Sequence, residues 1–149
     1  MSIYIASDHR GIELKDYLIS NLSHYYNIVT SNVENKEEDD YPDFAFDICS
    51  KMSKEEDFGI VICGNGVGIS IAANKVKGIR CARIDTIEDA IAAKEHNRAN
   101  VIALPATLDK DYAVDLALAF IKAKPSDLDR HVRRVNKIIA YENGDYNEL

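Results

Sequence analysis

The chain has 149 residues, of which 46% are hydrophobic and 29% are charged, and its formal net charge is −7. This length can bury a sizeable core in one domain, and we predict a single domain over residues 1–149. The negative charge argues against nucleic acid as a partner, because phosphate backbones require clustered lysine and arginine. No apolar run approaches the ~20 residues of a membrane span, and the first residues lack the pattern of a signal peptide, so no membrane partner is expected.

The cysteines Cys49, Cys63 and Cys81 are odd in number and lack the spacing of metal ligands. Such cysteines are typical of reduced thiols inside a cell. We therefore predict a cytoplasmic location and no metal site.

The first half of the chain alternates between strand and helix patterns. An apolar run predicts a strand at residues 3–6, and helical spacing of apolar residues predicts a helix at 11–22. A second strand is expected at 26–30. The acidic run at 34–40 is typical of a solvated loop, after which a proline suited to a first helical turn predicts a helix at 42–52.

The second half continues this alternation, with Gly78 closing one helix and Thr86 as the N-cap of the next. The expected elements are a strand at 59–62, a helix at 68–76, a strand at 79–84, a helix at 86–95, a strand at 101–104 and helices at 109–123 and 127–141. Five strands alternating with helices indicate α/β class and a parallel sheet covered on both faces, with one extra C-terminal helix. For a doubly wound sheet of this length we predict the flavodoxin-like order 2-1-3-4-5.

That order makes the first and third strands neighbours at the switch point, where ligands bind beyond the carboxyl ends of the strands. Asp8 and His9 follow the first strand, whereas Cys63 and Gly64 follow the third. The topology therefore predicts one crevice that contains an acid, an imidazole, a thiol and a glycine-rich loop.

The thiol of Cys63 directly precedes the alternating glycines Gly64, Gly66 and Gly68, which lead into a helix-compatible stretch. Glycines allow the backbone to turn sharply and to approach a ligand closely. Successive amides at the start of a helix also create a concave site for a negative oxygen. A thiol beside such a site indicates chemistry on a carbonyl or an enediolate.

Two other interpretations of this segment remain open. A cysteine at the end of a buried strand is often a small core residue. The loop is also similar to the dinucleotide-binding fingerprint, with Asp85 near the place of the acid that binds ribose. Against a nucleotide, the spacing is Gly-x-Gly-x-Gly, and Ile69 stands where the third fingerprint glycine is needed for packing.

Polar residues near the end of the chain form two further groups. His96 and Asn97 end the fourth helix, and Arg130 and Arg134 lie four residues apart on one face of the last helix. Two guanidinium groups on one face match a phosphate through paired donors. A solvated helix face is the alternative interpretation of the two arginines.

Together these motifs closely resemble the sugar-phosphate isomerase family that contains the B-type ribose-5-phosphate isomerases and the galactose-6-phosphate isomerases. The resemblance covers nearly the whole chain and is carried by Ser7-Asp8-His9-Arg10-Gly11, Asp40-Tyr41-Pro42-Asp43, residues 63–75, residues 95–101 and Arg130-His131-x-x-Arg134-Val135. It implies a three-layer αβα sandwich and a phosphorylated sugar as substrate. It also implies no cofactor, and a homodimer or dimer of dimers whose active site is shared between two chains.

The resemblance further implies how the reaction is divided among residues. Cys63 resembles the base that moves a proton between carbon 1 and carbon 2 of the sugar, and His96 resembles the acid that helps to open the furanose ring. Asp8 resembles a residue close to the sugar hydroxyls, and Asn97 one that steadies the reacting oxygens. Moving a proton between adjacent carbons needs no electron sink, which agrees with the absence of a cofactor.

Binding roles follow in the same way. His9, Arg130 and Arg134 resemble ligands of the phosphate group, and Tyr41 resembles a residue that lines the pocket. The amides expected to hold the enediolate oxygen belong to Gly64, Asn65, Gly66, Val67 and Gly68.

Two departures from the family pattern bear on the reaction. Asn65 stands where most members with the cysteine have a threonine whose hydroxyl assists proton transfer. Val67 occupies the place of a glutamate base found in a subgroup that lacks the cysteine, which leaves Cys63 as the base. Thr107 stands where the family commonly has an arginine that contacts phosphate, and Arg10, Lys75 or Arg133 remain open as replacements.

Ribose 5-phosphate is the expected substrate, because the chain keeps both the cysteine and the His-Asn pair of a self-sufficient homomeric enzyme. A six-carbon substrate such as allose or galactose 6-phosphate is the first alternative. A non-catalytic module that binds a nucleotide or a sugar phosphate is the second.

Overall fold

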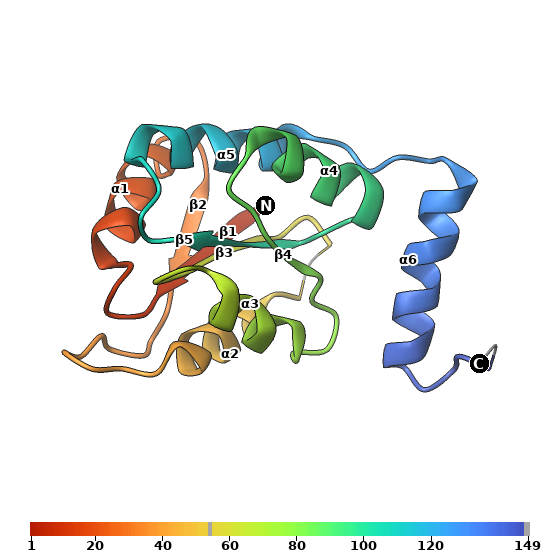
Figure 1. Ribbon diagram of the computed structural model, residues 1–149, viewed down its shortest axis with the longest axis horizontal. Helices are drawn as coiled ribbons and strands as arrows, with labels where there is room; N and C mark the ends of the chain where they lie inside the picture. Colours follow the sequence, from red (N-terminus) through yellow and green to blue (C-terminus); the bar gives the residue numbers. More distant parts are fainter. Residues whose placement is uncertain (54, 148–149) are drawn as a thin grey trace.

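The computed structural model describes residues 1–53 and 55–147. Within these residues, strands and helices alternate as the apolar pattern predicts, and a further helix follows at the end (Figure 1). The elements are β1 (Ser2–Ser7), α1 (Ile12–Leu22), β2 (Asn27–Thr30), α2 (Tyr41–Lys51), β3 (Phe58–Cys63), α3 (Val67–Asn74), β4 (Cys81–Arg83), α4 (Ile87–Asn97), β5 (Val101–Pro105), α5 (Lys110–Lys122) and α6 (Asp129–Glu142).

The strands form one open parallel sheet in the order β2-β1-β3-β5-β4. Helices α1, α4 and α5 cover one face, α2 and α3 cover the other, and α6 stands at the side (Figure 1). The expected α/β class and parallel sheet are therefore confirmed. The expected order 2-1-3-4-5 is wrong, because β5 lies between β3 and β4.

The burial of the last two strands explains this order. All five residues of β5 are buried, as is typical of a strand inside a parallel sheet with both faces covered. In contrast, β4 is shorter than the predicted strand at 79–84, and it ends in the exposed Arg83, as is typical of an edge strand. The exchange places Pro105 of β5 in register with Cys63 of β3, which brings residues 106–108 to the predicted crevice.

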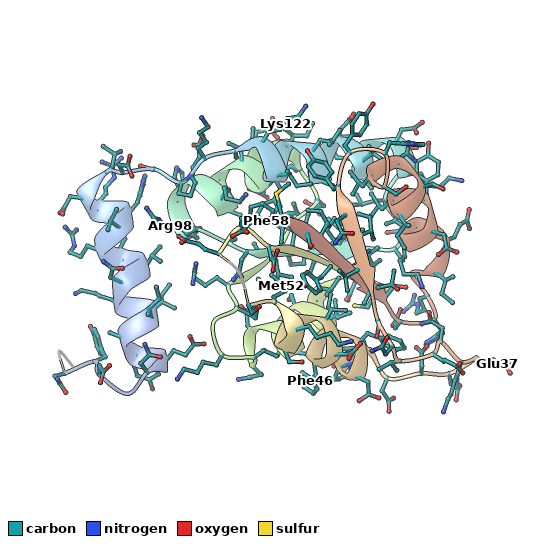
Figure 2. The ribbon with its side chains drawn as sticks, turned by 180° about the vertical axis from the view of Figure 1, so that it is seen from behind. Glu37, Phe46, Met52, Phe58, Arg98 and Lys122 are labelled. Atoms are coloured by element: carbon teal, nitrogen blue, oxygen red, sulfur yellow. The ribbon has the colours of Figure 1, made fainter. Side chains whose placement is uncertain are left out.

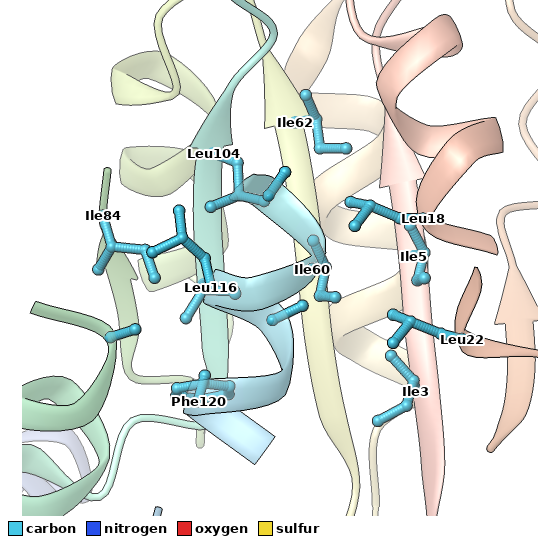
Figure 3. Close-up of a cluster of buried hydrophobic side chains, with 14 of the residues drawn as sticks. Ile3, Ile5, Leu18, Leu22, Ile60, Ile62, Ile84, Leu104, Leu116 and Phe120 are labelled. Atoms are coloured by element: carbon cyan, nitrogen blue, oxygen red, sulfur yellow. The ribbon is translucent and has the colours of Figure 1, made fainter. Parts of the chain in front are cut away.

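Alternation along β3 decides which way the thiol points. Ile60 and Ile62 pack in the larger core beneath α1, α4 and α5 (Figure 3), whereas Val61 and Cys63 pack in the core on the α2 and α3 face. Cys63 is the last residue of its strand, and α3 begins four residues later. The side chain therefore lies on the face that the beginning of α3 covers.

The C-terminal helix α6 stands beside the sheet rather than over either of its faces (Figure 1), and it contacts α4. Val135 is buried on α6, but Ile138 and Tyr141 are exposed at 50% and 67%. Among the described residues, no helix has both the length and the apolar character needed to cross a membrane.

Candidate active site

A hollow of about 620 Å³ lies at the carboxyl edge of the sheet, at the switch point between β1 and β3. It is lined by Asp8, Arg10, Tyr41, Cys63, Gly64, Asn65, Gly68, Arg83, Asp85, Pro105, Thr107 and Leu108. The structure therefore brings together six of the predicted site residues, which are Asp8, Tyr41, Cys63, Gly64, Asn65 and Gly68.

The loop between β3 and α3 forms one wall of this hollow. Cys63 is 5% exposed, and the turn that follows requires a φ of +78° at Gly66, a conformation that favours glycine. The Asn65 side chain accepts a hydrogen bond from the Val67 amide at 3.0 Å. Because of this bond, the Val67 amide already has a partner within the turn.

Two side chains from other elements pack directly on the glycines of this loop. A Cβ atom on Gly68 would lie 2.7 Å from Cζ of Tyr41, and one on Gly64 would collide with the guanidinium of Arg10. Glycine at both positions thus lets Tyr41 and Arg10, which also line the hollow, approach the loop that follows Cys63.

Asp8 is 5% exposed at the end of β1, where its Oδ1 accepts a hydrogen bond of 2.9 Å from the Arg10 amide. Its own amide donates to the Ile62 carbonyl at 3.1 Å. These bonds fix the carboxylate and tie the loop after β1 to β3.

His9 does not line the hollow, and its ring is held by Asp39 instead. Nδ1 of His9 lies 2.8 Å from Oδ1 of Asp39, and the His9 amide donates to the same oxygen at 2.7 Å. Burial acts to raise the pKa of Asp39, but hydrogen bonds from Asn35, His9 and Lys36 outweigh it and lower that pKa to about 2. The prediction of a solvated acidic loop is therefore wrong for Asp39, because its side chain is only 6% exposed.

Asp8, His9 and Asp39 place possible ligand atoms within 4.8 Å of one another. Their hydrogen bonds explain this arrangement. Asp8 accepts from the Arg10 amide, and Asp39 Oδ1 contacts both the backbone amide and the ring Nδ1 of His9. Asp39 and His9 thus join the loop after β2 to the loop after β1, whereas the Asp8 carboxylate is held within its own loop.

Gly66 and Val67 belong to the loop that follows Cys63, whereas the other four predicted site residues, His96, Asn97, Arg130 and Arg134, lie toward the opposite edge of the sheet. Helix α4 runs back toward the amino ends of the strands, so His96 and Asn97 in its last turn lie just before β5. The five residues of β5 span about 16 Å, which separates this edge from Cys63. Arg130 and Arg134 lie at the beginning of α6, which packs against α4.

His131, which the sequence-based assignment of roles left out, stacks on His96 with 4.5 Å between ring centroids. Burial and the nearby charge of His96 lower its pKa. Arg80 holds the same helix end, since its guanidinium donates to the carbonyls of Asn97 and Arg98 at 3.1 Å and 2.8 Å. The position of His131 in the Arg-His-x-x-Arg motif and that of Arg80 just before β4 did not indicate these contacts, because spacing along the chain does not show which helix ends meet.

The pairing of Arg83 with Asp85 was also not predicted from the sequence. Nη1 of Arg83 lies 2.7 Å from Oδ2 of Asp85, and its Nε donates to the Asn65 carbonyl at 3.0 Å. Asp85 is thus paired with an arginine that supports the thiol loop, which argues against its role as a ribose ligand.

A second hollow, of about 630 Å³, lies between α6 and the amino edge of the sheet, near Phe58 and Arg98 in Figure 2. Lys94 is 4% exposed there, with its ammonium 3.6 Å from the centre of the Phe58 ring and 4.3 Å from that of Phe120. Burial lowers the pKa of Lys94 to about 8. This hollow contains none of the predicted site residues.

An open parallel sheet with a polar hollow at its switch point defines a doubly wound α/β protein, the class in which ligands bind beyond the carboxyl ends of the strands. The sequence profile of the Ribose/Galactose Isomerase family matches residues 3–138, and the chain belongs to this family.

Individual relatives agree with this assignment. The chain is 40% identical to the probable ribose-5-phosphate isomerase B of Mycoplasma genitalium, over 95% of each chain. The structure of ribose-5-phosphate isomerase B from the same organism, with bound ribulose-5-phosphate, matches with a TM-score of 0.87 and 39% identity over 95% of this chain and 96% of the other. The Clostridium thermocellum ribose-5-phosphate isomerase B matches with a TM-score of 0.89 and 39% identity, over 97% and 99% of the two chains.

Proposed function

We propose that this chain is an aldose–ketose isomerase that interconverts ribose 5-phosphate and ribulose 5-phosphate through an enediolate. The observation that carries this proposal is the thiol of Cys63 beside the glycine loop, in one hollow with Asp8 and Tyr41. The bound ribulose-5-phosphate in the M. genitalium relative supports the choice of substrate.

In the proposed reaction, Cys63 removes the proton from carbon 2 of the aldose and returns it to carbon 1 of the enediolate, while the proton of the hydroxyl group on carbon 2 passes to the oxygen on carbon 1. Asp8 binds the sugar hydroxyls. The developing negative oxygen is held by loop amides, which stabilise the transition state more than the neutral carbonyl because they are oriented in advance. Because the Val67 amide already donates to the Asn65 side chain, we propose that the other amides of residues 64–68 donate to the enediolate oxygen.

We further propose a homodimer, or a dimer of dimers, in which the second chain supplies His96, Asn97, Arg130 and Arg134. Within one chain these residues lie at the edge of the sheet opposite to Cys63. The exposed apolar side chains of Ile138 and Tyr141 on α6 offer a surface that a second copy can cover.

Arg10 is the best replacement for the arginine missing at Thr107. Both residues line the hollow, and among the described residues no ion pair involves the Arg10 guanidinium. Arg133 instead pairs with Asp129 on α6 at 2.9 Å, and Lys75 follows the far end of α3. We therefore include Arg10 among the ligands of the substrate's anionic group.

Ketose formation by the purified protein tests the function directly. Ribose 5-phosphate, allose 6-phosphate and galactose 6-phosphate are compared by kcat/KM, and ribose 5-phosphate is expected to give the highest value. A higher value for a six-carbon sugar favours the first alternative substrate class. Binding of sugar phosphates without turnover of any of them favours a non-catalytic module.

Metal removal is expected to leave turnover unchanged. Proton transfer between adjacent carbons through a thiol and an amide-stabilised enediolate requires no metal ion. The measurement is the initial rate before and after dialysis against EDTA, with elemental analysis of the dialysed protein. A loss of activity that one divalent ion restores contradicts the proposed mechanism.

Cys49, Cys63 and Cys81 are free thiols in the structure. This state fits a reducing compartment. We accordingly propose that the protein works in the cytoplasm.

A further inference from the structure

We propose that Asp39 is a positioning residue of the phosphate site. Its carboxylate holds Nδ1 of the His9 ring, so that Nε2 of the same ring donates to phosphate only when the ring is charged. This inference rests on the proposed function and on the role of phosphate ligand that the family resemblance implies for His9, which lies directly after Asp8 of the hollow. It makes phosphate binding depend on a residue of the loop that follows β2.

The carboxylate of Asp39 is fixed through both of its oxygens. Oδ1 accepts from the His9 amide at 2.7 Å and lies 2.8 Å from Nδ1 of its ring. Oδ2 accepts from the Asn35 side chain at 3.0 Å and from the Lys36 amide at 3.1 Å. Asn35 also donates to the Ser7 carbonyl at 2.9 Å, so the acid is anchored to β1 itself.

The two side chains differ in exposure, as expected when one residue contacts the ligand and the other supports it. The Asp39 side chain is 6% exposed, whereas that of His9 is 31% exposed. Ligand can therefore reach the imidazole from solvent while the carboxylate stays behind it.

The proton between the two groups belongs to His9. Asp39 has its pKa lowered to about 2, so it is ionised at neutral pH and can only accept. Nδ1 must then carry a hydrogen, because two acceptors at 2.8 Å would repel each other. The Asp39 amide is 3.4 Å from Nδ1 and is the weaker partner.

This assignment of the proton controls what Nε2 can do. A neutral imidazole has one hydrogen, and with that hydrogen on Nδ1 the other nitrogen is an acceptor that repels phosphate oxygens. Only the charged ring carries a hydrogen on both nitrogens. His9 therefore acts as a phosphate donor in its protonated form alone.

The charges around His9 favour that form. The hydrogen bond to Asp39 has the largest effect and raises the pKa of His9 above 6.5; burial and Arg10 act to lower it, and the charges of Asp39 and Asp8 act to raise it. Phosphate binding is strongest below this raised pKa and weakens as the pH rises through it. A phosphate group completes its own ionisation near pH 6, so the loss at higher pH belongs to the protein.

The first test is a histidine titration by NMR, in which His9→Gln identifies the His9 signal among the four histidines. We expect the neutral ring of the unmodified protein to carry its hydrogen on Nδ1, and Asp39→Asn to lower the His9 pKa. Glu38→Gln, an exposed neighbour on the same loop, serves as the matched control and should leave the titration unchanged. An unchanged His9 pKa in Asp39→Asn, or a neutral ring with its hydrogen on Nε2, overturns the proposal.

The second test is kinetic. At pH 7.5, Asp39→Asn should raise KM for ribose 5-phosphate several-fold with little change in kcat, because the loss of the Asp39 carboxylate lowers the His9 pKa and leaves less of the ring charged at this pH. The same substitution in a His9→Gln background should add nothing, and turnover of unphosphorylated ribose should be unaffected. Independent, additive effects of the two substitutions contradict the role of Asp39 through His9.

Failure of the proposed function is distinguishable from failure of this inference. If the unmodified protein turns over no sugar phosphate, the proposed function falls. Inorganic phosphate then serves as the probe, and its affinity is measured from the shift of the His9 signal. Weaker phosphate binding in Asp39→Asn, or in Asp39→Ser if the first variant does not fold, supports the inference; equal binding overturns it.

Discussion

Replacing Cys63 with alanine is expected to reduce turnover of ribose 5-phosphate by ~10²–10⁴-fold, the usual effect of removing a general base. Substrate affinity should change little, because the loop amides and the phosphate ligands remain. The measurements are kcat for the isomerisation and the dissociation constant of a non-reacting sugar phosphate. Cys81→Ala, which removes a thiol from β4 outside the hollow, is the matched control. Near-normal turnover in Cys63→Ala contradicts the assignment of the base.

Alkylation gives an independent measure of the same thiol. Burial raises the pKa of Cys49 to about 12 and also raises that of Cys81, so both remain protonated and react slowly. Iodoacetamide should therefore inactivate the protein through Cys63, which lines the hollow, and bound substrate should protect it. Mass spectrometry of the inactivated protein identifies the modified residue.

Mixing two inactive variants, Cys63→Ala and His96→Ala, should restore activity if the active site is shared. His96 belongs to the opposite edge of the sheet from Cys63 within one chain, so the two substitutions damage different contributions to each site. After subunit exchange, equal amounts should recover about a quarter of the unmodified activity, because half of the dimers are mixed and each contains one intact site. Initial rates before and after exchange provide the measurement.

The control for this experiment mixes Cys63→Ala with Asp8→Ala, whose residues line the same hollow of one chain. In that mixture, each of the two sites of a mixed dimer has one substitution, either Cys63→Ala or Asp8→Ala. No activity should therefore return. Verified exchange without recovery in the first mixture contradicts the shared site.

The sequence predicted the elements and the place of the thiol well, because both depend on local patterns. A continuous apolar run predicted the strand at 59–62, and β3 extends one residue further at each end, from Phe58 to Cys63. The order of the last two strands was harder to predict, because the same alternation of strands and helices fits both 2-1-3-4-5 and the observed 2-1-3-5-4. The continuous apolar run in β5 and the arginine in β4 already favoured the observed order, because only the interior strand is buried on both faces.

The supporting residues of the site were harder to predict, because their roles arise from contacts between distant segments. Asp39 stands in an acidic run that resembles a solvated loop, and only folding brings it against His9, thirty residues away. His131 was visible in a motif, yet its stacking on His96 depends on how α6 packs against α4. Asn65 was recognised as a departure, but its bond to the Val67 amide is a property of the folded turn.

The position of β5 also has a consequence for the order in which the molecule assembles during synthesis. The edge strand β4 pairs with β5 and is separated by it from β3, although β4 leaves the ribosome first. Until residue 105 emerges, β4 lacks its hydrogen-bonding neighbour and the nascent sheet ends at β3. Because such non-local pairing forms late, the wall formed by residues 105–108 closes around Cys63 only when most of the chain has been made. The hollow around Cys63 is therefore complete only after β5 has paired with β3.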